Sequence, residues 1–176
     1  MKLLGLMRHA KSDWGQSDQR DFDRGLNDRG RRGGKLVGEH IREHGLKWDH
    51  IVASPAERVV QTLAQAMPDA DIAYDKRLYL ASSDTITEVA AEVGGEAHAV
   101  LIVGHNPGLQ DTVLSLVAPG QENDLFEEAK VKFPTASFAV IELPINRWTD
   151  LKPETGRLAH LARPRDLDPA LGPQED

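Results

Sequence analysis

Short apolar segments alternate along this chain with longer stretches that have the composition of helices. Residues 3–7, 51–53 and 99–103 each read as a strand that runs into a polar turn and then into a helix-like stretch. Residues 137–143 form a further apolar segment near the end of the chain. Repeated strand–helix units are the building pattern of a parallel sheet covered by helices. The alternation therefore predicts an α/β fold built on a mostly parallel sheet.

The residues that flank one predicted helix define both of its ends. Residues 28–44 have the length and composition of a helix, Asn27 before them is a good N-cap, and Gly45 after them is a typical C-terminal stop. The remaining predicted elements are helices at residues 59–67, 84–93 and 107–117, a short strand at residues 72–74 and an edge strand at residues 158–162.

The length of the chain fits one domain. With 176 residues, 40% of them hydrophobic, it is long enough for one core and short for two. From Pro164 onward the sequence contains several prolines and acidic residues and few apolar ones. We therefore expect a single domain over residues 1–163, followed by a loosely ordered C-terminal tail over residues 164–176.

The absence of cysteine limits the chemistry open to this chain. Without cysteine there is no disulfide framework, no thiolate nucleophile and no thiolate metal ligand. No stretch reaches the roughly 18 to 20 apolar residues that a membrane helix needs, and the opening residues carry no signal-peptide pattern. We expect a cytoplasmic protein that does not associate with membranes.

Charge is distributed unevenly along the sequence. The formal net charge is −7, which argues against a nucleic-acid partner because binding the phosphate backbone needs a surplus of lysine and arginine. Residues 1–35 nevertheless hold nine Lys or Arg against five Asp, a net charge of +4, while the remainder carries −11. A basic face built from the first segment would attract a small anionic ligand.

Polar residues of an unusual kind follow three of the predicted strands. The first strand runs into Arg8 and His9, the second into residues 54–58 (Ser-Pro-Ala-Glu-Arg), and the third into residues 104–108 (Gly-His-Asn-Pro-Gly). In open parallel sheets, ligands bind beyond the carboxyl ends of the strands. If these three strands are neighbours, two arginines and two histidines converge on one place.

The third of these segments is suited to an anion. Asn106 is a good N-cap and Pro107 fits the first helical position, so His105 is predicted to lie at a helix N-terminus. Free backbone N–H groups and the helix dipole attract negative charge there. A phosphate is the natural ligand of such a position.

The two arginines and His9 complete a phosphoryl-transfer site. Arg8 and Arg58 supply permanently charged guanidinium groups that match phosphate oxygens, and phosphoryl transfer depends mainly on such electrostatic support. A neutral imidazole nitrogen of His9 can attack phosphorus at ordinary pH and form a phosphohistidine that water later hydrolyses. The sequence thus predicts a phosphatase with His9 as its nucleophile.

These segments are similar to the motifs of one known family. Residues 6–10 (Leu-Met-Arg-His-Ala) resemble the Arg-His-Gly signature of the histidine phosphatase superfamily, with Ala10 in place of the usual glycine. Residues 54–62 resemble its Ser-Pro-x-x-Arg-x-x-Gln-Thr stretch, residues 103–107 its second-histidine segment, and residues 26–30 its helix-opening segment. The resemblance covers roughly residues 1–162. The opening residues and residues 21–24 look most like the small SixA-type branch, whose named activity is phosphohistidine phosphatase.

The resemblance implies a fold, an activity and a set of site residues. The fold would be phosphoglycerate mutase-like, a three-layer α/β/α sandwich with a mostly parallel central sheet. The activity would proceed through a covalent phosphohistidine intermediate and would need no metal and no other cofactor. The residues carried over are the catalytic set of His9, Arg8, Arg58 and His105, with Ser54 and Asn106 added to Arg8, Arg58 and His105 for substrate binding.

A general acid is missing from its expected place. Larger members of the superfamily carry an acidic residue before the second histidine, whereas residues 79–83 contain none, and Asp84 and Glu88 read as parts of a helix. A phosphohistidine substrate needs no acid, because its ring leaves as neutral imidazole, whose conjugate acid has a pKa of about 6.5. The gap therefore favours a nitrogen–phosphorus bond. Four aspartates of the loop after His9 remain candidate substitutes: Asp13, Asp18, Asp21 and Asp23.

Other functions have weaker support in the sequence. Residues 40–44 (His-Ile-Arg-Glu-His) match the H-x-x-E-H zinc pattern, but no third ligand segment is evident and the segment reads as an ordinary amphipathic helix. His50, His98 and His160 carry no pattern and are interpreted as structural. No nucleotide-binding loop or serine-hydrolase elbow is present. A phosphoglycerate mutase of this superfamily is generally longer.

The expected partner is a phosphorylated substrate, with a phosphohistidine protein as the first candidate. The alternatives are a small-molecule phosphomonoesterase of the same superfamily and a phospho-ligand binding module without turnover, and the retained His9 argues against the second. Selectivity is expected to come from the loops at residues 11–25 and 121–134. Trp14, Phe22 and Phe126 are candidates either for a docking surface or for the core.

Overall fold

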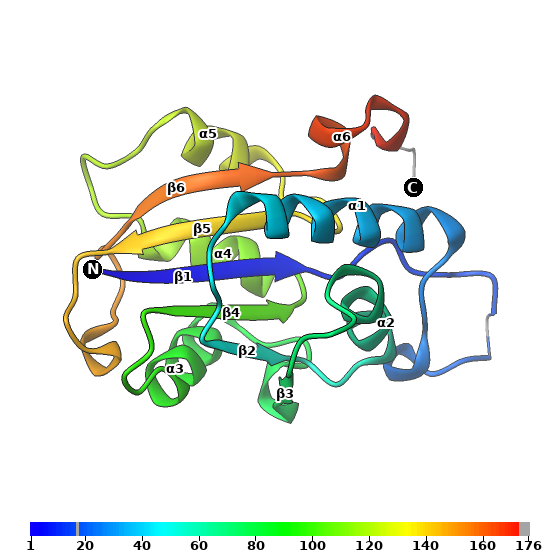
Figure 1. Ribbon diagram of the computed structural model, residues 1–176, viewed down its shortest axis with the longest axis horizontal. Helices are drawn as coiled ribbons and strands as arrows, with labels where there is room; N and C mark the ends of the chain where they lie inside the picture. The colour runs from blue at the N-terminus through cyan, green and yellow to red at the C-terminus, as the bar shows by residue number, and fades with distance from the viewer. Residues whose placement is uncertain (17, 173–176) are drawn as a thin grey trace.

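A six-stranded sheet forms the centre of the protein in a computed structural model that describes residues 1–16 and 18–172 (Figure 1). Its order is β3-β2-β4-β1-β5-β6, and β3, β2, β4 and β1 pair in parallel. β5 is antiparallel to both of its neighbours, so five strands run in one direction. The strands are β1 (Lys2–Arg8), β2 (His50–Ala53), β3 (Ala73–Tyr74), β4 (Ala99–Gly104), β5 (Phe138–Leu143) and β6 (Arg157–Ala162).

Helices cover both faces of this sheet. The α-helices are α1 (Asp28–His44), α2 (Glu57–Ala66), α3 (Ser83–Val93), α4 (Gly108–Leu116), α5 (Asp124–Val131) and α6 (Pro164–Leu167). Short 3-10 turns lie at Asp21–Asp23, Lys76–Leu78, Trp148–Asp150 and Pro169–Leu171. The predicted three-layer α/β/α architecture with a mostly parallel sheet is confirmed. Among the described residues, no helix has the length and apolar character needed to cross a membrane.

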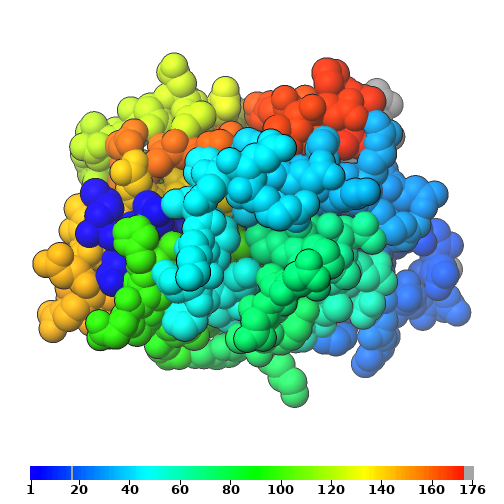
Figure 2. All heavy atoms as spheres, viewed as in Figure 1, coloured from blue at the N-terminus to red at the C-terminus, as the bar shows by residue number. Residues whose placement is uncertain are grey.

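The C-terminal segment differs from the loosely ordered tail that the composition predicts. Up to Gly172 it forms α6 and a 3-10 turn that pack against the start of α1, as Figure 2 shows where the red end of the chain meets the blue part of that helix. Arg29 donates hydrogen bonds to the carbonyl oxygens of Ala170 and Gly172, and Arg32 forms an ion pair with Asp168. The composition of this segment alone would not predict an ordered structure. Contacts with α1 supply that order. Residues 173–176 lie outside the described part.

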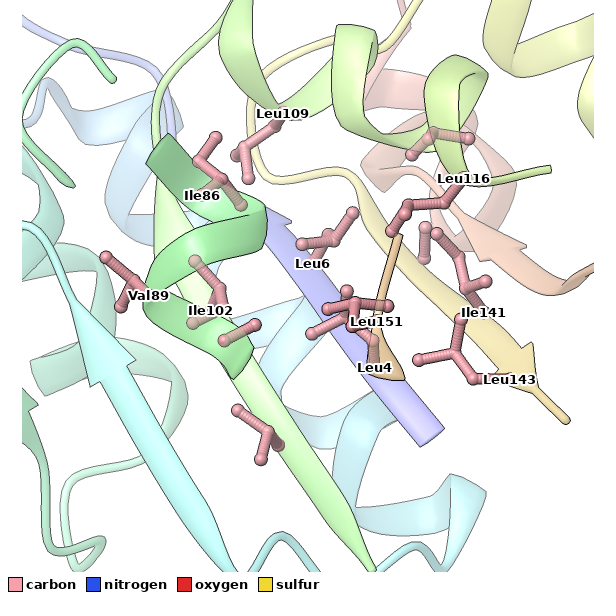
Figure 3. Close-up of a cluster of buried hydrophobic side chains, with 14 of the residues drawn as sticks. Leu4, Leu6, Ile86, Val89, Ile102, Leu109, Leu116, Ile141, Leu143 and Leu151 are labelled. Carbon is pink, nitrogen blue, oxygen red and sulfur yellow. The ribbon is translucent and has the colours of Figure 1, made fainter. Parts of the chain in front are cut away.

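Two apolar clusters hold the three layers together. On one face of the sheet, alternate β1 residues Leu4 and Leu6 pack with side chains from α3 and α4 (Figure 3). On the other face, Met7 of β1 packs with Val37 of α1 and Leu63 of α2. Strand side chains alternate between faces, so a parallel strand covered on both sides needs apolar residues at nearly every position. This is why the central strands are continuous apolar runs in the sequence.

The predicted ends of α1 are both confirmed. The Asn27 side chain accepts a hydrogen bond from the backbone N–H of Gly30 at 2.8 Å, which satisfies one of the free donors at the helix start. Gly45 adopts a left-handed conformation with φ of 82°, which a residue without a Cβ adopts at little cost.

Several predicted segments differ in detail from the structure. The helix expected at residues 59–67 begins two residues earlier, at Glu57, and so includes Arg58. The helix expected at residues 107–117 begins one residue later, at Gly108, and it follows a cis peptide bond between Asn106 and Pro107. Pro107, and not Asn106 as predicted, therefore occupies the N-cap position. The Asn106 side chain accepts a hydrogen bond from the backbone N–H of Gln110 at 3.2 Å. The segment 121–134, expected as a loop, contains the short helix α5, which Asn123 caps.

Close packing of α1 against α2 yields a test of the fold. A Cβ atom added to Gly38 would lie 2.3 Å from the carbonyl oxygen of Ala66, whereas one added to Gly33 would find nothing nearer than 3.8 Å. We expect Gly38→Ala to lower the free energy of unfolding by about 1 to 3 kcal/mol through overpacking. The control Gly33→Ala gains helix propensity of up to about 1 kcal/mol, so we expect it to be neutral or stabilising. Urea unfolding measures both; equal effects would contradict this account of the packing.

Candidate active site

Three strand ends meet at one edge of the sheet, as the sequence predicts. β4 lies between β1 and β2, and the register pairs Arg8 with Gly104 and Ala53 with Val103. The residues after these strands open onto a cavity of about 800 Å³, whose lining includes Arg8, His9, Arg58, His105 and Asn106. Ser54 lies completely buried beside this cavity and contacts His105. The structure therefore brings all six predicted site residues together.

His9 is held in one tautomer by the backbone. Its Nδ1 atom lies 2.8 Å from the carbonyl oxygen of Ala10, and because a carbonyl only accepts, Nδ1 must carry the proton and donate it. Nε2 is then left with its lone pair. The backbone N–H of Ala10 donates to the Thr62 hydroxyl, and that hydroxyl donates to the carbonyl oxygen of Arg58. A buried chain of hydrogen bonds thus connects the orientation of His9 to helix α2.

The surroundings of His9 keep its ring neutral. Burial lowers its pKa well below the ordinary value, and the positive charges of Arg8 and Arg58 lower it further, against the raising effect of the hydrogen bond to Ala10. Only 6% of the residue is exposed. A neutral imidazole with an available Nε2 lone pair is the reactive form of a histidine nucleophile.

His105 lies beside His9 and forms its own hydrogen bond. The two ring centroids are 5.4 Å apart, and His105 Nε2 lies 2.7 Å from the Ser54 hydroxyl oxygen. Burial, followed by the charge of Arg58, lowers the pKa of His105 to about 3. At neutral pH the His105 ring is therefore a neutral imidazole.

Arg58 is almost fully buried and is held by Asp21. One terminal nitrogen donates to the backbone oxygen of Asp21 at 2.7 Å and the other to its carboxylate at 3.0 Å. The same carboxylate accepts hydrogen bonds from Arg24 and from the Tyr79 hydroxyl. Partial burial acts to raise the pKa of Asp21, but the hydrogen bonds from Tyr79, Arg24 and Arg58 outweigh it and hold the pKa far below its usual range. Asp21 is thus an ionised carboxylate that fixes a buried guanidinium.

Arg8 and Asn106 share one hydrogen-bond acceptor. Both side chains donate to the carbonyl oxygen of Phe133, Arg8 at 3.2 Å and Asn106 at 2.9 Å. That oxygen belongs to the segment between α5 and β5, which the sequence marks only as a loop. A backbone carbonyl from a later segment of the sequence therefore holds the side chains of both strand-end residues.

The carboxylates named as candidate acids fall in different places. Asp21 lines the cavity, and it is the only carboxylate among the described lining residues. The other three candidates, Asp13, Asp18 and Asp23, do not line it. Asp84 and Glu88 lie in α3, as expected of parts of a helix, and do not line it either. Arg24 and Tyr79 are site residues that sequence reasoning did not select, because nothing in their local pattern indicates that they reach Asp21.

The histidines of the H-x-x-E-H pattern gather away from this cavity. His40 Nε2 lies 2.8 Å from His160 Nε2, and the ring centroids of His44 and His160 are 4.3 Å apart. His160 of β6 is therefore a third histidine that lies beside His40 and His44 of α1. Within the described part of the chain, however, no group of three histidine, cysteine or acidic side chains is arranged to hold a metal ion.

Comparison with known proteins gives the family. The model of the histidine phosphatase superfamily (branch 1) matches residues 4–80. An uncharacterised protein of Mycobacterium leprae (strain TN) is 34% identical over 162 residues, covering 90% of this chain and 100% of that protein. The solved structure of SixA from Nakamurella multipartitia is 32% identical, with a TM-score of 0.82, and covers 93% of this chain and 96% of that one. SixA from Agrobacterium tumefaciens is 29% identical, with a TM-score of 0.74 and coverage of 92% and 97%.

The chain belongs to the histidine phosphatase superfamily, and it is a phosphatase with the phosphoglycerate mutase-like fold. Its similarity to the SixA structures assigns it to the SixA-type branch of that superfamily.

The neutral state of His105 predicts a pH dependence of stability. In the folded protein its pKa is about 3, whereas in an unfolded chain it returns to about 6.5. Between these values the unfolded state binds more protons, so this histidine makes stability fall as the pH drops from about 6.5 toward 4. We expect His105→Asn to reduce that slope by up to about 1.4 kcal/mol per pH unit.

Urea unfolding at a series of pH values measures the slope directly. His50→Asn, at an exposed position on β2, is the matched control, and we expect it to keep the slope of the wild type. A His105→Asn slope equal to that of the wild type would show that this histidine is not held neutral by the fold.

Proposed function

We propose that this phosphatase hydrolyses the phosphohistidine of a protein substrate through a covalent intermediate on His9. The observation that carries the proposal is the single tautomer of His9, whose Nδ1 donates to Ala10 while Nε2 keeps its lone pair. A group that only bound phosphate would gain nothing from this arrangement, since it needs donors and positive charge rather than a nucleophile. The alternative of a non-catalytic binding module leaves the geometry of His9 unexplained.

In the first step, His9 Nε2 attacks the phosphorus atom of the substrate. A bond forms between Nε2 and phosphorus as the bond from phosphorus to the substrate nitrogen breaks, and the electron pair of that bond leaves with the substrate ring. The His9 ring becomes positively charged, and its Nδ1–H donates more strongly to the Ala10 carbonyl. Arg8 and Arg58 stabilise the phosphoryl oxygens, with His105 and Asn106 as further binding groups.

In the second step, a water molecule attacks the phosphorylated His9. The oxygen of the water bonds to phosphorus, the bond to Nε2 breaks and its electron pair returns to the ring, and the proton of the water passes to a phosphate oxygen. His9 is again neutral, with the same tautomer. Burial and the neighbouring cations that lower the pKa of His9 favour this return to the neutral ring.

The leaving group explains why a phosphohistidine is the preferred substrate. Asp21 is the only carboxylate among the described residues that line the cavity, and its strongly lowered pKa keeps it ionised at neutral pH. It therefore has no proton to give to a departing alcohol. An imidazole protonated on its far nitrogen leaves as a neutral molecule without such help, whereas an alkoxide does not. We assign Asp21 the role of positioning Arg58.

Without a general acid, the rate must depend steeply on the leaving group. Across a series of aryl phosphates whose phenols span a range of pKa values, we expect kcat/KM to fall as the pKa of the phenol rises. A positioned acid contributes a factor of about 10² to 10⁴ and flattens such a dependence. Asp21→Asn is the control, expected to change the binding of every substrate without changing the slope. A flat dependence in the wild type that becomes steep in Asp21→Asn would make Asp21 the acid.

Removal of the nucleophile tests the intermediate itself. We expect His9→Ala to abolish phosphate release from both a phosphohistidine-bearing transfer protein and a generic aryl phosphate. Rapid acid-free quenching of the wild type should trap an acid-labile phosphoprotein that His9→Ala does not form. His50→Ala, outside the cavity, serves as the matched control and should retain activity. Full activity of His9→Ala would overturn the mechanism, and an aryl-phosphate-specific enzyme would favour the small-molecule alternative.

A further inference from the structure

The cavity extends far beyond the place where a phosphoryl group would bind. Besides the strand-end residues, its lining includes Arg29 of α1, Lys132 after α5 and Arg165 of α6. These three residues come from separate elements, and Lys132 and Arg165 lie outside the segments that resemble the family's motifs. A space of about 800 Å³ leaves room for more of a substrate than the group that reacts.

The walls of the cavity are positively charged although the protein is acidic. Among the described residues, seven lysine and arginine side chains line it, against one carboxylate, that of Asp21. The chain as a whole carries a formal net charge of −7. Positive charge gathered in a concave site attracts and orients anions against the field of the remaining surface. One phosphoryl group does not account for cations that line the outer part of the cavity.

Two of the outer arginines differ in their pairing from most others. In the described residues, nine arginines lie within ion-pair distance of a carboxylate: Arg20, Arg24, Arg31, Arg32, Arg58, Arg77, Arg147, Arg157 and Arg163. Among the same residues, Arg165 lies within ion-pair distance of no carboxylate, and Arg29 donates only to the backbone oxygens of Ala170 and Gly172. Carbonyl oxygens orient the Arg29 side chain but do not neutralise its charge.

We propose that Arg29, Lys132 and Arg165 form an outer anion subsite that binds acidic side chains flanking the phosphohistidine of a protein substrate. The inference rests on the proposed function, which it extends by naming the character of the substrate. A polypeptide suits the rest of the lining, because Trp14 and Leu80 also contribute and are 72% and 56% exposed. Apolar side chains at the mouth of a basic cavity match a segment that carries both acidic and apolar residues.

The outer subsite also gives a role to the ordered C-terminal segment. α6 brings Arg165 to the cavity, and the turn after it brings Leu171 and Gly172. Contacts with Arg29 and Arg32 of α1 hold this segment in place. The residues proposed to select the substrate are thus different from the strand-end residues proposed to carry out the reaction.

Two phosphohistidine peptides of equal length test the subsite. One carries Asp and Glu on both sides of the phosphohistidine, and the other carries Asn and Gln at the same positions. With the wild type we expect kcat/KM to be about tenfold higher for the acidic peptide, and we expect the preference to shrink as salt is raised. Arg165→Ala should reduce the preference about fivefold, the upper range for one solvent-accessible ion pair.

Two further variants separate the subsite from general effects of charge and folding. Lys132→Ala, on a different wall of the cavity, should reduce the preference in the same direction without altering α6. Arg147→Ala removes an exposed arginine that does not line the cavity, and it should keep the full preference. Circular dichroism of each variant verifies that it is folded.

The outcomes distinguish the two proposals. Equal hydrolysis of both peptides by the wild type, or an unchanged preference in both Arg165→Ala and Lys132→Ala, overturns the outer subsite and leaves the proposed function intact. If the wild type releases phosphate from an aryl ester but from neither peptide, the proposed function is wrong. The outer subsite, which rests on that function, is then wrong as well. If Arg147→Ala also lowers the preference for the acidic peptide, that preference comes from the net charge of the protein, and the outer subsite is overturned.

Discussion

The parallel pairing of β1 with β4 is the constraint on which the rest of the site depends. It places Arg8 opposite Gly104, and the backbone N–H of His9 donates to the Gly104 carbonyl at 3.0 Å, so His9 and His105 leave the sheet side by side. A slip of one residue would turn every side chain of β1 to the other face of the sheet. The apolar residues that cover both faces of these strands therefore also fix the distance between the two histidines.

Burial has a second consequence at this edge of the sheet. Removing histidines from water beside two arginines disfavours their charged forms, so His9 and His105 are both neutral. The same burial would leave Arg58 without a counterion, and Asp21 supplies one from the loop after β1. One physical effect thus keeps the proposed nucleophile, His9, uncharged, and it also leaves Asp21 ionised, without a proton to donate. The proposed preference for a nitrogen–phosphorus bond follows from this combination.

The polar contacts around the site reach across the whole chain. Asp21 accepts hydrogen bonds from Arg58 and Tyr79, and the carbonyl oxygen of Phe133 accepts hydrogen bonds from Arg8 and Asn106. The outer wall of the cavity adds residues from the first and the last α-helix. The base of the cavity thus comes from residues at the strand ends, while its walls come from segments that are distant in the sequence. On the two proposals made above, reaction type and substrate selectivity are set by these different parts of the molecule.

The sequence by itself determined the fold class, both ends of α1 and the residues at the base of the site. Apolar runs mark buried strands, Asn27 and Gly45 mark the ends of α1, and Arg8, His9 and Arg58 follow strand ends that a parallel sheet brings together. These are local patterns, and local interactions decide them. Only the tertiary structure decided that Asp21 is the counterion of Arg58, that α5 and α6 form, and that Arg165 lines the cavity. Each of these features depends on contacts between segments that are distant in the sequence. The strength of such contacts cannot be inferred from a local sequence pattern.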